Sequence, residues 1–227
     1  MAKRKQTKGV CQICKNAFSK TGMTRHLAKC LPDHEDSGTA VSKSPPKKVQ
    51  LLQILAQGKY NTDYWLVVEM PATATLRELD QFLRDIWLEC CGHLSEFVIG
   101  GEHYSGQTAD YMWDALPLEE ESMDVPVGKV LSPGMKFTHD YDFGSTTRLV
   151  LKVVGERQGK VGKKLVRLLE RNDPPEVLCE KCEKKPAVWV DVFEEYQWCC
   201  ENCIENSKEG VLPLVNSPRA GVCGYTG

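Results

Sequence analysis

The chain has 227 residues, 41% of them hydrophobic and 26% charged, which is the composition of a globular protein and excludes a wholly disordered one. Its mean hydropathy is −0.37, and its apolar runs are far shorter than the roughly 18 to 20 residues that a membrane helix needs. The basic start Met1-Ala2-Lys3-Arg4-Lys5 lacks the apolar segment of a secretory signal, so we expect a cytoplasmic protein. In that compartment, 11 cysteines favour metal binding over disulfides.

Charge and composition divide the chain into unlike segments. The net charge of −2 averages +8 over residues 1–50, −6 over residues 51–175 and −4 over residues 176–227, a pattern typical of a basic arm on an acidic body. Residues 32–48 are rich in Ser, Pro and Gly, which is the composition of a linker. The pair Pro174-Pro175 ends the central part. The sequence therefore predicts a basic arm with a zinc finger (1–31), a linker (32–48), an α+β domain (49–175), a zinc ribbon (176–205) and a tail (206–227).

The first segment contains Cys11, Cys14, His26 and Cys30, spaced as in a Cys-Cys-His-Cys variant of the DNA-type zinc finger. A CxxC turn supplies two thiolates, while His26 and Cys30 are four residues apart and share one face of a helix. Phe18 and Met23 would form its small apolar plug, so metal binding and folding should be one event. The alternative is three unrelated cysteines and a solvated histidine.

Basic side chains surround this motif and would contact the phosphates of DNA or RNA. They are Lys3, Arg4, Lys5, Lys8, Lys15, Lys20, Arg25 and Lys29. One finger buries too little surface for tight specific binding by itself. A protein-binding or purely structural finger with a solvated basic surface therefore remains the alternative.

The central segment begins with two β-rich stretches, Val49 to Ala56 and Tyr64 to Met70, which predict a pair of strands. Thr75 and Glu78 form a capping-box signature at the start of an apolar helical stripe that extends to Trp87. Gly92 supplies a helix stop.

Hairpins dominate the rest of this segment. One is expected from Leu94 to Tyr104 and a second from Met135 onward, turning at Asp142 to Ser145, with Lys164 to Leu169 as a last strand beside it. The acidic run Glu119-Glu120-Glu121 is expected in a loop. These elements predict an α+β fold, a mainly antiparallel sheet with one principal helix packed on it, flanked by two small zinc modules.

Over roughly residues 49–175 the chain resembles the plasmid pRiA4b ORF-3-like family, through IWLECCGHLSEFVIGGEHYS, PGMKFTHDYDFGSTTRLVLKV and LLERNDPPEVLCEKC. The most specific part is Tyr141-Asp142-Phe143-Gly144 together with His93, Leu94 and Phe97. The resemblance implies a compact α+β domain of bacterial or mobile-element origin, and it implies architecture more than activity.

The polar residues of the domain that could converge into a hydrolase or metal site are His93, His103, His139, Asp140 and Asp142. The alternative is that Asp142 caps the hairpin turn and the histidines lie at the surface or pack in the core. Cys90 and Cys91 are expected to be buried packing residues rather than nucleophiles.

Near the end, Cys179, Cys182, Cys200 and Cys203 form two CxxC pairs with the spacing of a zinc ribbon. Cys199 could replace Cys200, but the CxxC spacing favours Cys200 and leaves Cys199 as a packing residue. Four thiolates close the metal shell, so the site is expected to be structural, and the net charge of −4 argues against phosphate binding.

The sequence as a whole predicts a non-catalytic protein with two zinc ions, and it leaves Cys90, Cys91, Cys199 and Cys223 outside any metal site. The leading hypothesis is a nucleic-acid-associated or regulatory adaptor that binds DNA or RNA through the N-terminal arm and a protein through the central domain or ribbon. The alternatives are a protein-interaction scaffold with structural zinc sites and, less favoured, a hydrolase-type enzyme. No membrane role is expected.

Overall fold

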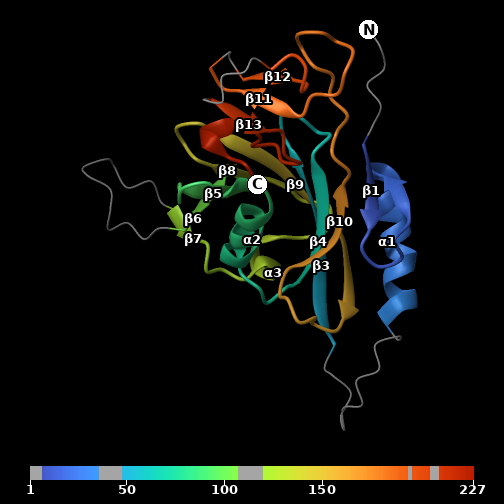
Figure 1. The fold of residues 1–227 in the computed structure, drawn as a ribbon. Coiled ribbons are helices and arrows are strands. Elements are labelled where there is room, and N and C mark those ends of the chain that lie inside the picture. Colours follow the sequence, from blue (N-terminus) through green and yellow to red (C-terminus); the bar gives the residue numbers. More distant parts are fainter. Residues whose placement is uncertain (1–6, 36–47, 107–119, 194–195, 205–209) are drawn as a thin grey trace, which may run out of the picture.

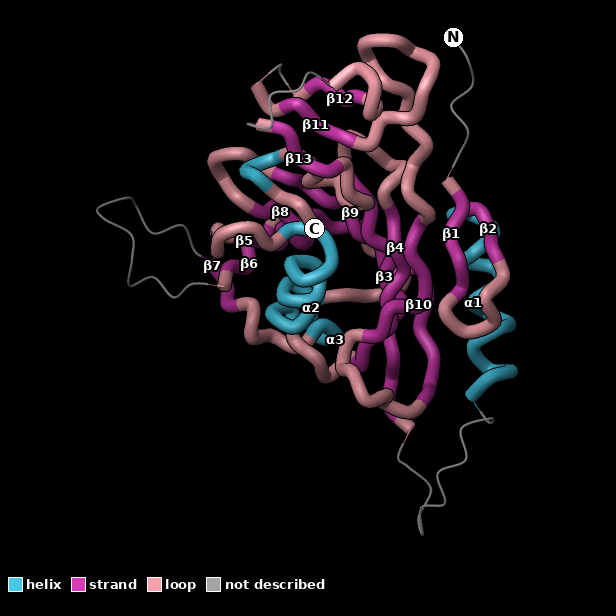
Figure 2. Tube along the Cα trace, in the orientation of Figure 1, coloured by secondary structure: helices cyan, strands magenta, loops and turns pink. Residues whose placement is uncertain are grey.

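The computed structural model describes all residues except 1–6, 36–47, 107–119, 194–195 and 205–209. It is built on a ten-stranded sheet in the order β2-β1-β10-β4-β3-β9-β8-β5-β6-β7 (Figures 1 and 2). The strands are β1 (Lys8–Cys11), β2 (Ala17–Ser19), β3 (Val49–Gly58), β4 (Trp65–Pro71), β5 (Ser95–Ile99), β6 (Glu102–Ser105), β7 (Glu120–Ser122), β8 (Lys136–Tyr141), β9 (Thr147–Gly159) and β10 (Arg167–Asn172). Neighbouring strands pair antiparallel except β6 with β7, which are parallel.

The hairpins expected from the sequence form, and the sheet is mostly antiparallel with few helices. Two details differ from expectation. Glu120 and Glu121 lie in strand β7 rather than in a loop, because β7 adds to the outer edge of β6. The last strand of the domain, β10, does not pair beside the β8–β9 hairpin but with β4, on the other side of β3.

Both faces of the middle of the sheet are covered, and β4 shows why. Successive side chains of a strand point to opposite faces. Leu66 and Val68 therefore join the core under helix α2 (Leu76–Leu83), while Trp65 and Val67 join a second core under helix α1 (Lys20–Glu35). All seven residues of β4 are buried, and Figure 1 shows α1 and α2 on opposite sides of β4 and β10.

Helix α2 begins where the sequence predicts. The Thr75 hydroxyl accepts a hydrogen bond from the Glu78 amide, and the Glu78 carboxylate accepts one from the Thr75 amide, which completes the capping box. The helix continues into a π-helical turn, η1 (Arg84–Leu88), that buries Trp87 against the sheet. A short helix, α3 (Val127–Val130), closes the end of this core.

The ribbon has its own three-stranded sheet in the order β12 (Gln197–Cys199), β11 (Trp189–Asp191) and β13 (Val211–Pro213). Its third strand comes from the segment after residue 205, which the sequence analysis treated as a tail. No described helix is long and apolar enough to cross a membrane.

After β13 the chain returns to the central domain. The Trp87 indole donates to the Asn216 carbonyl at 3.1 Å, and the Ser217 hydroxyl donates to the Trp87 carbonyl at 2.7 Å. The chain then makes a single turn, η3 (Val222–Gly224), after which Tyr225 is buried. The C-terminal segment is therefore part of the folded body of the protein.

Candidate metal centres

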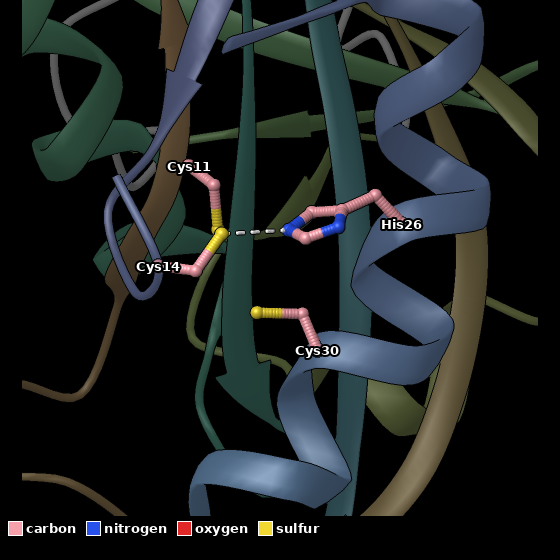
Figure 3. A group of neighbouring side chains, drawn as sticks. All are labelled: Cys11, Cys14, His26 and Cys30. Atoms are coloured by element: carbon pink, nitrogen blue, oxygen red, sulfur yellow. Dashed lines mark hydrogen bonds between the residues drawn. The ribbon is translucent and has the colours of Figure 1, made fainter. Parts of the chain in front are cut away.

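The predicted finger ligands Cys11, Cys14, His26 and Cys30, here called the finger cluster, come together between β1 and α1 (Figure 3). The amide of Lys15 donates to the Cys11 carbonyl at 2.9 Å, and Lys15 takes a left-handed conformation with φ of 63°. This turn directs both sulfurs of the CxxC pair toward the helix.

The finger cluster has the dimensions of a tetrahedral zinc site. Its four ligand atoms lie within 4.8 Å of one another, and the Cys14 sulfur is 3.2 Å from His26 Nε2. Around a zinc ion, bond lengths of about 2.3 Å to sulfur and 2.0 Å to nitrogen place two sulfurs about 3.8 Å apart and a sulfur and a nitrogen about 3.5 Å apart. The Cys14–His26 distance is therefore within a few tenths of an ångström of its value around zinc, and the Phe18 ring, stacked at 4.0 Å on His26, orients the imidazole.

The finger is built into the central domain. Strand β1 pairs antiparallel with β10 over Gly9 to Cys11 and extends the main sheet by a hairpin. Met23, Leu27 and Leu31 of α1 are buried against Trp65. Metal binding at this cluster would therefore stabilise one end of the main sheet as well as the finger itself.

Electrostatics at the finger cluster favour a cation. Burial, followed by the neighbouring Cys14 sulfur, raises the pKa of Cys30 to about 12, because adjacent sulfurs cannot all ionise without a positive charge between them. Glu170, opposite Cys11 on β10, is fully buried, and neither carboxylate oxygen has a hydrogen-bond partner among the described residues. Burial, then Asp173 and Cys14, raises the pKa of Glu170 to about 8, so this carboxyl group adds no full negative charge at neutral pH.

The ribbon ligands Cys179, Cys182, Cys200 and Cys203, here called the ribbon cluster, also lie within 4.8 Å of one another. The first pair repeats the finger turn: the Glu183 amide donates to the Cys179 carbonyl at 2.8 Å, and Glu183 has φ of 54°. The sulfurs of Cys182 and Cys200 are 3.9 Å apart, close to the spacing around zinc. Cys199 is buried and stays outside the cluster, as the CxxC spacing predicts.

The ribbon sulfurs differ in how readily they ionise. Burial opposes ionisation of Cys179, but backbone amides of Cys200, Cys182 and Lys181 donate to its sulfur and lower its pKa to about 6. Hydrogen bonds with the sulfurs of Cys200 and Cys182 raise the pKa of Cys203 to about 12. A thiolate preformed at Cys179 among four clustered sulfurs is a ready site for a dication, which binds thiolates and displaces the protons of neighbouring thiols.

The basic residues expected at phosphates are placed unevenly. Lys8, Lys15, Arg25 and Lys29 are exposed, whereas Lys3, Arg4 and Lys5 lie outside the described residues. Lys20 is partly buried, and its ammonium donates to the Gln57 side chain at 2.9 Å and the Thr62 carbonyl at 3.1 Å. Burial lowers the pKa of Lys20, although Asp63 opposes this, and its contacts fasten the finger to the sheet.

The histidines and carboxylates considered for the central domain do not all converge into one site, although His93 and Asp142 lie together, with His93 Nε2 3.5 Å from Asp142 Oδ2. His139 is fully buried and its Nε2 lies 2.7 Å from Asp80, while His103 pairs with Glu96 at the surface. Asp140 pairs with Arg148, and Asp142 with Arg219.

The sequence matches the family of plasmid pRiA4b ORF-3-like proteins over residues 48–179, more than half of its length. The chain belongs to this family. A comparison with curated proteins gives no match. Among solved structures, the crystal structure of MM3350, a protein of unknown function from Methanosarcina mazei Go1, is similar at 15% identity and a TM-score of 0.41, over 51% of this chain and 65% of that one. The chain thus spans just under two thirds of that protein.

Within the plasmid pRiA4b ORF-3-like domain, the Tyr141-Asp142-Phe143-Gly144 motif forms the β8–β9 turn. Asp142 has φ of 65°, and its Oδ1 accepts from the amides of Gly144 at 3.0 Å and Ser145 at 3.1 Å, the capping role expected from the sequence. Its Oδ2 accepts from Arg219 of the C-terminal segment. The motif therefore shapes the hairpin and also anchors a part of the chain beyond the matched residues.

Of the cysteines left outside any predicted site, Cys199 is placed as expected, but Cys90, Cys91 and Cys223 are not. Cys91 is exposed, so its interpretation as a buried packing residue is wrong, and Cys90 is only partly buried. Cys90, Cys91 and Cys223 gather with His93 as a third group with metal-ligand geometry. No spacing motif in the sequence indicates this group, because its members come from two segments that are 130 residues apart.

Proposed function

We propose that the protein is a zinc-binding, nucleic-acid-associated adaptor without a catalytic role. In this proposal one zinc ion occupies the finger cluster and another the ribbon cluster, and the finger contacts phosphates of DNA or RNA. The proposal keeps the cytoplasmic and bacterial or mobile-element setting that the sequence led us to expect.

The observation that carries this proposal is the exposed basic face of α1. Arg25 and Lys29 are exposed and four residues apart, so they lie on one side of the helix. The opposite side is buried against the sheet through Met23 and Leu27. Because the sheet already holds this helix in place, its cations can contact a partner without a folding step.

Two further exposed cations lie outside the helix, Lys8 on β1 and Lys15 on the turn after that strand. Phosphate contacts of this kind give affinity and position without sequence specificity. A finger held against a sheet is therefore suited to support binding by a larger assembly rather than to read a sequence alone.

The test is fluorescence anisotropy of the zinc-loaded full chain with labelled duplex DNA and single-stranded RNA over a range of salt concentrations. Arg25→Gln with Lys29→Gln should weaken binding and reduce the slope of log K against log salt by about 2, since each phosphate contact contributes about 0.9. The charge-matched control, Lys184→Gln with Lys185→Gln in the ribbon, should leave the slope unchanged. Binding that does not depend on salt, or equal losses in both variants, would reject the proposal.

A second candidate is a protein-interaction scaffold. It is favoured by large apolar side chains exposed on the ribbon, namely Leu178, Val188, Phe193 and Tyr196, of which Phe193 is 74% exposed. Recovery of one stoichiometric protein partner after nuclease treatment, lost on Phe193→Ser but retained in the Arg25→Gln, Lys29→Gln variant, would favour this candidate over the first.

A further inference from the structure

Cys90, Cys91 and His93 follow η1 in a surface loop, and Cys223 reaches them from the C-terminal segment; these four residues are here called the loop–tail cluster. Their ligand atoms all lie within 4.8 Å of one another, as in the finger and ribbon clusters. Unlike those clusters, this one is largely at the surface, with Cys91 and Cys223 exposed and Cys90 and His93 partly buried.

The distances within the loop–tail cluster are close to those around one tetrahedral metal ion. The Cys91 and Cys223 sulfurs are 3.8 Å apart, those of Cys90 and Cys91 are 3.5 Å apart, and His93 Nε2 is 3.4 Å from the Cys223 sulfur. These values compare with about 3.8 Å between sulfurs and about 3.5 Å between sulfur and nitrogen around zinc. The one short pair, Cys91 sulfur to His93 Nε2 at 2.9 Å, would open by several tenths of an ångström on binding.

The loop that carries three of these ligands is held in shape by its own hydrogen bonds. The Glu89 carboxylate accepts from the Gly92 amide at 2.5 Å and from the Tyr141 hydroxyl at 2.9 Å. That hydroxyl in turn accepts from the His93 amide at 3.3 Å, and Gly92 takes the left-handed conformation that the turn requires. The loop is therefore organised without help from the ligand side chains.

The C-terminal segment is directed to the same point. Arg219, fully buried, donates to Asp142 at 2.6 Å and to Thr147 at 2.9 Å, which fixes the segment four residues before the ligand. Cys223 itself has φ of 51° and lies in a single helical turn, so the backbone adopts an uncommon conformation where its thiol meets the loop. A non-glycine residue in this conformation marks a position that the surrounding contacts hold in place.

We propose that Cys90, Cys91, His93 and Cys223 form a third zinc site, which fastens the C-terminal segment to the central domain. Three thiolates and one imidazole are a donor set for zinc, and ligation releases the thiol protons to solvent. Because two of its ligands are exposed, this site exchanges metal more readily than the finger and ribbon clusters.

The first test uses the unmodified full chain. The protein is reduced with a phosphine, loaded with zinc, freed of excess metal and treated briefly with N-ethylmaleimide, and each modified cysteine is identified by peptide mass spectrometry. Cys91 and Cys223 should be protected although they are exposed, and a mild chelator should restore their reactivity before that of Cys14 or Cys182. Rapid alkylation of Cys91 and Cys223 in the zinc-loaded protein would overturn the proposal.

The second test measures the zinc content of variants. Cys91→Ser with Cys223→Ser should bind one zinc ion fewer than the unmodified protein, and both side chains are exposed, so the fold should survive. Cys199→Ser is the matched control, a cysteine outside all three clusters, and should cause no loss. The difference between variant and parent decides the matter whatever the absolute content, and a difference of zero would overturn the proposal. These results are independent of nucleic-acid binding.

Discussion

The Arg219 guanidinium donates to the Asp142 carboxylate at 2.6 Å, with the Arg219 side chain fully buried and that of Asp142 only 6% exposed. The pair joins the C-terminal segment to the turn of the β8–β9 hairpin. Both charges are removed from water, so each depends on the other for compensation. The hydrogen bond from Arg219 holds the pKa of Asp142 below its usual value, although burial opposes this.

Removing one member of this pair should be costly. We expect Arg219→Met to lower the free energy of unfolding by about 3 to 5 kcal/mol, because it leaves the Asp142 carboxylate buried without its partner. The measurement is urea unfolding of the zinc-loaded protein. The control is Arg77→Met, whose partner Asp124 is 62% exposed, and it should cost no more than about 1 kcal/mol. Equal losses would show that the buried pair contributes nothing special.

The buried contact between Asp80 and His139 predicts a pH dependence. Burial favours the neutral form of Asp80, but His139, Arg84 and Ser95 contact its carboxylate and hold its pKa below the ordinary value. As pH falls, the unfolded chain binds this proton first, since its pKa is about 3.9. The stabilisation from the Asp80 contacts is therefore complete above about pH 5, declines as pH falls through the unfolded pKa and is lost as pH falls through the folded pKa.

Asp80→Asn should accordingly lower Tm most at pH 6 to 7, with the difference from the parent shrinking toward pH 3. Thermal melts of both proteins at each pH measure this, and the comparison cancels any zinc release that they share. Asp124→Asn, at an exposed pair, should have a small effect throughout. A Tm difference for Asp80→Asn that stays constant with pH would contradict the prediction.

Local signals in the sequence predict much of this fold. The Thr75 and Glu78 capping box and the β8–β9 hairpin depend on residues close together in the chain, and both form as expected. The CxxC pairs are equally local, so the structure brings the finger and ribbon ligands together at the predicted positions.

Long-range pairing could not be predicted in the same way. Nothing near Gly9 indicates that β1 will pair with Asn172 of β10, and no spacing motif links Cys91 to Cys223. One signal was available: the unbroken apolar run from Trp65 to Val68 is typical of a strand buried on both faces. Such a run indicates that a second element covers the other face of the sheet, and in the structure this element is α1.

The close approach of β1 to β10 gives a test of how the finger is attached. A Cβ atom on Gly9 would lie 2.6 Å from the Arg171 carbonyl oxygen and 3.0 Å from the Trp65 ring, so Gly9→Ala must separate the strands. We expect a loss of about 1 to 3 kcal/mol and faster hydrogen exchange in β10. Gly162→Ala, where the nearest atom is 3.8 Å away, should be nearly neutral. Unchanged exchange in Gly9→Ala would contradict the docked arrangement.

The finger and ribbon clusters share no ligands, so their metal ions should stabilise separate parts of the chain. Cys30→Ser should loosen α1 and speed tryptic cleavage after Arg25 and Lys29, whereas Cys182→Ser should speed cleavage after Lys181 and Lys184. Each variant serves as the control for the other, and mass spectrometry of timed digests identifies the sites. Without metal, the segments that carry the ligands lose the bonds that hold them together, and the exposed basic residues beside each cluster then become more accessible to trypsin. If both variants sped cleavage at both places, the two clusters would be coupled through the sheet rather than independent.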